Sequence, residues 1–145
     1  MLSRSQALAL MQEYTASDSL RKHMLAVEGA MRAYAERFGE DVEEWGLAGL
    51  LHDFDYERWP NEAHSPDTEH PAEGVRILRG LGVGEPVLQA ILGHARYSGV
   101  PRESLNHQPL ISTDEEPILR ISIASSGGKS VWVSTSLMMT PFIRT

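Results

Sequence analysis

Residues 49–60, GLLHDFDYERWP, place an imidazole and a carboxylate side by side at the end of an apolar run. The two groups belong to His52 and Asp53, and a second acid, Asp55, follows two residues later. A buried carboxylate needs a partner, because an unpaired charge in a low-dielectric interior is strongly unfavourable. Imidazole and carboxylate are both good ligands for divalent transition metals, so a metal ion would satisfy the two side chains together.

Helical patterns on both sides of this stretch predict which side chains face it. Residues 42–52 are apolar on nearly all sides, which is typical of a buried central helix. Residues 18–38 have an apolar stripe at helical spacing, and Gly39 is a natural end for that helix. The stripe consists of Leu20, Met24, Val27, Met31, Tyr34 and Phe38. His23 lies at the edge of this stripe, so we expect it to point inward.

Two later helices should bring in further histidines. The first begins at Pro71, directly after His70, and its expected inner face is Val75, Leu78 and Leu81. The second, within residues 84–97, has His94 on the same face as its apolar residues. A single inward histidine is usually a core residue with a hydrogen-bonding partner. Several on converging helices, together with Asp53, favour a metal site.

Composition limits the other functions. The chain has 145 residues, 41% of them hydrophobic, and a net charge of −7, which is typical of one ordinary globular domain. The negative charge argues against a nucleic-acid partner, because phosphate backbones need a basic surface. The absence of cysteine excludes disulfides and thiolate ligands. Without a signal peptide or a membrane-length apolar run, we expect a cytoplasmic protein with no membrane partner.

Four motifs in order resemble the HD-domain metal-dependent phosphohydrolases. GLLHDFDYERWP, HPAEG, AILGH and STDEE match the pattern of a small branch of predicted HD hydrolases over about residues 20–116. The resemblance implies a mainly α, compact HD-type helical bundle with metal between the helices. It also implies the metal ligands, which are His23, His52, Asp53 and Asp114 for a first ion and His70 and His94, with Asp53 bridging, for a second.

The resemblance implies the chemistry as well. Metal-activated water would hydrolyse a phosphoester of a nucleotide or another small phosphorylated metabolite, with Asp53 at the centre. Asp55 recurs in the family motif, so it should orient a ligand histidine. Lys22 and Arg96 are the preferred candidates for a phosphate clamp, ahead of Arg21 and Arg58. Glu57 could orient a ligand or lie on a solvated rim, and His64 could face the substrate from the loop.

The end of the chain departs from the family. The family helix continues past the acid that corresponds to Asp114, whereas here Pro117 follows three residues later. Residues 118–136 alternate apolar and polar around a Gly-Gly turn and favour a short β-hairpin, with an irregular C-terminal segment as the alternative. We therefore expect an HD-type domain over 1–116 and a divergent segment over 117–145 packed on it. Divergence serving an oligomer contact and an altered reading frame are both open explanations.

Two other functions stay open beside hydrolysis. The same six ligands would serve a dinuclear-iron HD oxygenase, and loss of Asp114 would leave a non-catalytic ligand-binding regulatory module. We expect one or two divalent ions, with Fe or Mn favoured over Zn, Co, Ni and Mg. Substrate identity, the physiological metal and the oligomeric state do not follow from the sequence.

Overall fold

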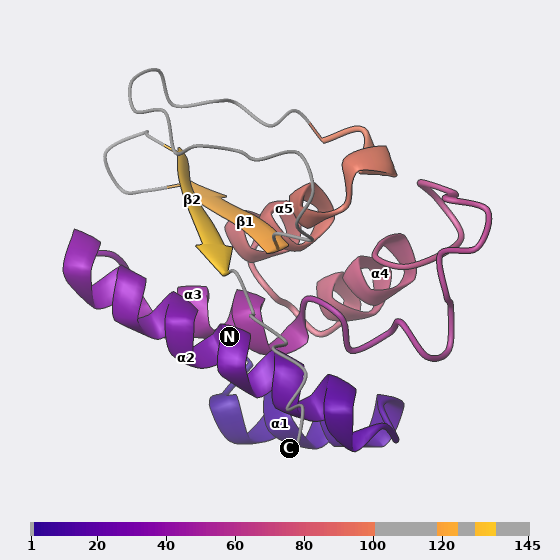
Figure 1. The fold of residues 1–145 in the computed structure, drawn as a ribbon, viewed down its shortest axis with the longest axis horizontal. Helices are drawn as coiled ribbons and strands as arrows, with labels where there is room; N and C mark the ends of the chain where they lie inside the picture. The colour runs from indigo at the N-terminus through magenta and orange to yellow at the C-terminus, as the bar shows by residue number, and fades with distance from the viewer. Residues whose placement is uncertain (1, 101–118, 125–129, 136–145) are drawn as a thin grey trace, which may run out of the picture.

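A computed structural model describes residues 2–100, 119–124 and 130–135. These ranges are mainly helical, which confirms the expected fold class (Figure 1). No helix within them is both long enough and apolar enough to cross a membrane. The elements in chain order are α1 Arg4–Tyr14, α2 Asp18–Phe38, α3 Val42–Leu51, α4 Ala72–Gly80, α5 Glu85–His94, a single 3-10 turn η1 Arg96–Ser98, β1 Leu119–Ala124 and β2 Ser130–Thr135.

The helix ends follow from local sequence. Ser3 caps α1, with Gln6 completing a capping box, and Ser17 caps α2. Gly39 ends α2 with φ +70°, a left-handed conformation that glycine adopts without steric cost. The Asp41 carboxylate accepts hydrogen bonds from two backbone N–H groups at the start of α3. These caps fix where α2 begins and ends and where α3 begins, and therefore the positions of His23 and His52 along the chain.

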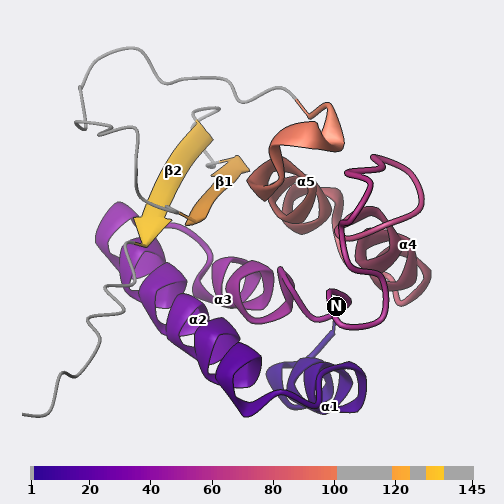
Figure 2. The ribbon, with the colours of Figure 1, turned by 45° about the vertical axis from the view of Figure 1, so that its right-hand side comes forward.

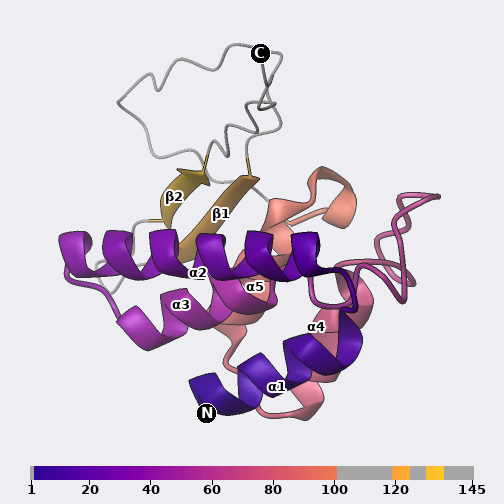
Figure 3. The same cartoon turned by 60° about the horizontal axis from the view of Figure 1, so that its bottom comes forward.

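Helix α3 is the centre of the core, as its apolar composition predicts. Every residue from Trp45 to Leu51 is buried. Helix α2 runs beside α3 in all three ribbon views, and α1 and α5 also contact α3 (Figures 1 and 3). The approach is close at Gly49, where an added β-carbon would lie 2.9 Å from Cα of Glu28. This contact brings the His23 turn of α2 against the end of α3.

Some sequence-based placements are wrong. Leu81 was expected on the inner face of the fourth helix, but it follows the last helical residue, Gly80, and is 49% exposed. Tyr34 and Phe38 continue the apolar stripe of α2, yet they are exposed and stack on each other. Pro71 is the N-cap of α4 and not its first residue. The Phe38 ring still contacts that of Trp45 in α3, at 6.3 Å between centroids, but periodicity alone does not reveal how much of a side chain at the end of α2 is covered.

The predicted hairpin is present. β1 pairs antiparallel with β2, with Leu119 opposite Thr135 and Ala124 opposite Ser130. β1 runs beside α5 and β2 beside α2 (Figure 2). The expected boundary between residues 116 and 117 falls outside the described ranges and stays a prediction.

Candidate metal centre

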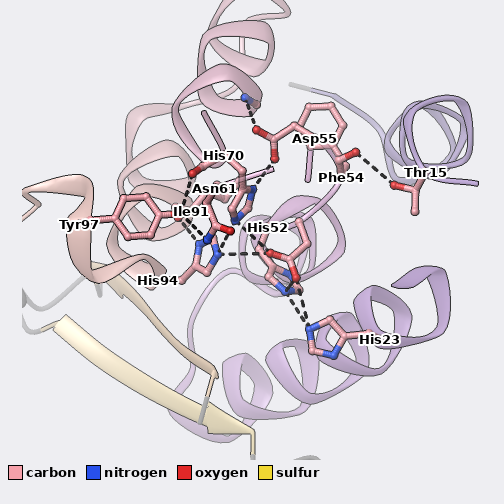
Figure 4. A network of polar contacts seen from close by, with 12 residues as sticks. Thr15, His23, His52, Phe54, Asp55, Asn61, His70, Ile91, His94 and Tyr97 are labelled. Atoms are coloured by element: carbon pink, nitrogen blue, oxygen red, sulfur yellow. Dashed lines mark hydrogen bonds and ion pairs between the residues drawn. The ribbon is translucent and has the colours of Figure 1, made fainter. Parts of the chain in front are cut away.

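Four histidines and one aspartate from separate parts of the chain meet between α2, α3 and α5. His23 belongs to α2, His52 and Asp53 directly follow α3, His70 lies before α4, and His94 is the last residue of α5. Figure 4 shows the His23 and His52 rings facing each other, and the His70 and His94 rings facing each other beside them. The structure thus brings together five of the six ligands that the resemblance implies.

Asp53 lies between two pairs of imidazoles. Its Oδ2 atom is 3.1 Å from Nε2 of His52 and 3.6 Å from Nε2 of His23. Its Oδ1 atom is 3.3 Å from Nε2 of His70 and 3.3 Å from Nε2 of His94. Each pair with Asp53 forms a group whose ligand atoms all lie within 4.8 Å of one another. One carboxylate therefore serves two adjacent positions, one oxygen to each.

The ring orientations present nitrogen lone pairs to the centre. Nδ1 of His52 lies 2.8 Å from the Gly49 carbonyl, and Nδ1 of His94 contacts the Ile91 carbonyl. A carbonyl only accepts, so both Nδ1 atoms carry the proton and both Nε2 atoms are bare in the neutral rings. The Nε2 atoms of His23 and His52 are 3.1 Å apart, as are those of His70 and His94. Nδ1 of His70 faces the Asp55 carboxylate, so its Nε2 is bare as well, and the two bare Nε2 atoms of His70 and His94 repel at this distance unless a cation lies between them; this donor set fits a metal ion.

The charges of the cluster residues also suit a divalent metal ion. Burial lowers the pKa of His23 and of His94, which keeps both rings neutral near neutral pH. Burial alone would also lower the pKa of His52, but the Asp53 carboxylate outweighs it and raises that pKa. Burial opposes ionisation of Asp53, yet His52 and His94 hold its pKa well below the usual range. The centre is one carboxylate among imidazoles, a mixture that divalent transition metals accept.

Asp55 holds His70 in place. Its carboxylate is 1% exposed, with Oδ1 2.6 Å from Nδ1 of His70 and Oδ2 accepting the N–H of Gly74 at 2.7 Å. Pro71 supplies no side-chain cap, so Asp55 serves the N-terminus of α4 instead. Only glycine fits at position 74, because a β-carbon there would lie 2.7 Å from Cγ of Asp55. This contact explains the glycine of HPAEG in physical terms.

Glu57, whose role the sequence left open, anchors the start of α2. Its two oxygens accept the N–H groups of Ala16 and Ser17, each at 2.8 Å. These hydrogen bonds lower the pKa of Glu57. Thr15, in the same turn, donates its hydroxyl to the Phe54 carbonyl at 3.1 Å. The segment after Asp53 therefore positions the helix that carries His23.

Two clefts reach the cluster. One, of about 650 Å³, is lined by Asn61, His64, His70, His94, Ala95, Arg96 and Tyr97. The other, of about 750 Å³, is lined by Ser17, Ser19, Leu20, Lys22, His23, Ala26, Tyr56 and Glu57. Asn61 and His64 belong to the loop between α3 and α4. The clefts touch different halves of the cluster, the first at His70 and His94 and the second at His23.

Each cleft carries one lysine or arginine side chain that has no partner among the described residues. Within the described residues, neither Lys22 nor Arg96 makes an ion pair or side-chain hydrogen bond. Arg21 instead donates to the Thr15 and Gln12 carbonyls, and Arg58 donates to the Glu13 carbonyl and lies over the ring of Tyr14. The suggestion that Arg21 or Arg58 clamps a phosphate therefore finds no support, because both hold α1.

Sequence reasoning missed Tyr97 and Asn61. The Tyr97 hydroxyl donates to the His70 carbonyl at 2.7 Å and accepts from the Asn61 side chain at 2.8 Å. Burial raises the pKa of Tyr97, so its hydroxyl is protonated and able to donate. His64 contacts the Tyr97 ring at 4.9 Å between centroids. A tyrosine three residues after His94 was the only signal available. Asp114 lies outside the described residues, and its ligand role stays a prediction.

Comparisons with known proteins identify the family of this chain. No solved structure matches it. A family model described as HD domain matches residues 20–122, which is most of the chain and spans every residue of the cluster. The chain belongs to the HD-domain family.

Proposed function

We propose that this protein is a metal-dependent phosphohydrolase acting on a small phosphorylated metabolite, such as a nucleotide. HD-domain proteins usually bind divalent metals and are mostly phosphohydrolases, and the His/Asp groups here could hold such ions. The observation that carries the proposal is Asp53, whose two oxygens each face a different pair of imidazoles. A single carboxylate shared in this way suits a pair of ions better than one.

The residues of the cluster would form two metal positions. His23, His52 and Oδ2 of Asp53 would hold one ion, and His70, His94 and Oδ1 of Asp53 the other. Divalent ions in such a site activate water and neutralise charge on the phosphoryl oxygens. Asp55 would keep Nδ1 of His70 protonated, so that Nε2 remains the ligand atom. Asp114 would complete the first position.

Lys22 and Arg96 would bind the anionic substrate. Both are exposed, both line a cleft that reaches the cluster, and neither is neutralised by a described protein group. Six other basic side chains of the described ranges are already engaged, namely Arg4, Arg21, Arg32, Arg58, Arg76 and Arg79. In a chain with net charge −7, two cations without a described protein partner beside the His/Asp cluster favour a phosphate-binding role.

The first test is metal content per chain, measured by elemental analysis of protein purified without chelator or histidine tag. About two equivalents of iron or manganese would support the shared-carboxylate site, and the loaded protein would then be screened against phosphomonoesters, phosphodiesters and nucleotides. Oxygen consumption without phosphate release would contradict hydrolysis and favour the oxygenase alternative. A protein that takes up no metal after reconstitution would overturn the enzyme proposal in favour of a regulatory module.

A further inference from the structure

The Tyr97 hydroxyl joins two parts of the cluster that come from distant segments. Tyr97 lies in η1, three residues after His94, and its hydroxyl donates to the backbone carbonyl of His70 at 2.7 Å. The side chain of Asn61 donates to the same hydroxyl at 2.8 Å. In Figure 4 the Tyr97 ring extends toward His70 from the side on which His94 lies. The oxygen thus accepts from one loop residue and donates to the backbone of a cluster residue.

His70 is held at three points, and Tyr97 supplies one of them. Asp55 holds the ring through Nδ1, and the Trp59 carbonyl accepts the backbone N–H of His70 at 2.8 Å. The carbonyl of His70 is held by Tyr97. Of these three contacts, only the last connects His70 to the chain segment that carries His94.

The segment between His94 and Tyr97 is short and internally bonded. The N–H of Ala95 donates to the Leu92 carbonyl, and the N–H of Ser98 donates to the Ala95 carbonyl, each at 3.2 Å. A shift of Tyr97 relative to His70 would therefore shift His94 as well. Their Nε2 atoms are 3.1 Å apart, although the two residues are separated by 24 positions in sequence.

We propose that Tyr97, supported by Asn61, is a positioning residue that sets the separation of His70 and His94 and so the affinity of the metal position they share. This inference rests on the proposed two-metal centre. The His23–His52 position takes no part in this chain of contacts, because the hydrogen bonds of the Tyr97 hydroxyl go to Asn61 and His70. The effect of Tyr97 should therefore be confined to one of two positions, which a general loss of stability would not produce.

The test is stepwise binding of Co(II) to the metal-free full-length chain, measured by calorimetry and by visible absorbance. For Tyr97→Phe, which keeps the ring and removes the hydroxyl, we expect one of the two dissociation constants, that of the His70–His94 position, to rise about 10–100-fold. The dissociation constant of the His23–His52 position should be unchanged. Tyr56→Phe is the matched control: the Tyr56 ring also contacts His70, at 5.3 Å between centroids, but within the described residues its hydroxyl makes no hydrogen bond. It should change neither constant.

A second variant tests the chain of contacts itself. Asn61→Ala should weaken the same position by less, and the double variant with Tyr97→Phe should be no worse than Tyr97→Phe alone, because both act through one hydroxyl. If Tyr97→Phe fails to fold, Asn61→Ala is judged by the same site-specific criterion.

Three outcomes would overturn the inference. Equal weakening of both positions would mean a merely structural role for Tyr97. If Tyr97→Phe binds two ions with the dissociation constants of the wild type, the two-metal centre is supported but Tyr97 has no positioning role in it. A wild-type chain that binds fewer than two Co(II) would refute the two-metal proposal, and this inference with it.

Discussion

Asp55 lies 2.6 Å from Nδ1 of His70, and this contact fixes which ring nitrogen of His70 faces the cluster. The other Asp55 oxygen accepts the N–H of Gly74, so one carboxylate satisfies a ligand-type histidine and a helix N-terminus together. An amide side chain has one accepting oxygen and cannot serve two donors in the same way.

Asp55→Asn should selectively weaken the metal position of His70 and His94. Either the His70 ring or the Gly74 N–H loses its acceptor, and outer partners of ligand histidines typically contribute 10–100-fold to metal affinity. Competition with a chromophoric chelator measures the two dissociation constants. Asp67→Asn, a change in the exposed part of the loop before α4, is the control and should leave both constants unchanged. Unaltered binding in Asp55→Asn would remove the orienting role.

Gly74→Ala should destabilise the protein although it raises helix propensity. The new β-carbon would lie 2.7 Å from Cγ of Asp55, and relieving such overpacking typically costs about 1–3 kcal/mol. Gly80→Ala, at the last residue of the same helix, meets nothing within 4 Å and should not destabilise the protein. Urea denaturation of the two variants compares them directly. Similar free energies of unfolding would show that Asp55 is not packed against α4.

Asp53→Ala should abolish binding at both metal positions and all turnover, since each position loses one oxygen of the same carboxylate. Elemental analysis after reconstitution gives the metal content. Glu62→Ala, in the exposed loop, should retain the wild-type content. Retention of one full equivalent by Asp53→Ala would contradict the shared-carboxylate arrangement.

Lys22→Ala and Arg96→Ala should each raise KM for a phosphoester about tenfold, the size expected for one charge-assisted hydrogen bond of about 1.5 kcal/mol. Bis-(p-nitrophenyl) phosphate and p-nitrophenyl phosphate are convenient probes. Arg37→Ala is the matched control, because Arg37 is also exposed and lacks a partner within the described residues but lies at the far end of α2 from His23. If the KM of either variant equals that of Arg37→Ala, the residue replaced in that variant does not bind the substrate.

We expect the stability of the folded protein to depend on pH through the Glu57 carboxylate. Its pKa in the folded chain is lowered by the N–H groups of Ala16 and Ser17 from an unfolded value of about 4.3. The ionised carboxylate therefore stabilises the fold above the unfolded pKa, and the contribution disappears as pH falls through the lower folded pKa. The Tm difference between wild type and Glu57→Gln should be largest near neutral pH and vanish in acid. A difference independent of pH would mean that charge is not involved.

The helices could be predicted from the sequence, because their ends and their apolar faces are encoded locally. Caps at Ser3, Ser17 and Asp41 and the apolar run of α3 depend on neighbouring residues only. His52 and Asp53 are adjacent in the chain, and the hairpin follows from alternation around a two-glycine turn. The family motifs then indicated which distant histidines belong with them.

Only the tertiary structure shows which side chains from distant segments contact one another. Three arginines and one lysine near the motifs look alike in sequence, yet packing engages Arg21 and Arg58 with carbonyls and leaves Lys22 and Arg96 in the clefts without a partner among the described residues. The bond from Tyr97 to His70 spans 27 residues and depends on how η1 meets the loop. Exposure of Leu81 likewise depends on where its helix ends. Periodicity reports the face of a helix, whereas contacts between segments depend on how the helices pack.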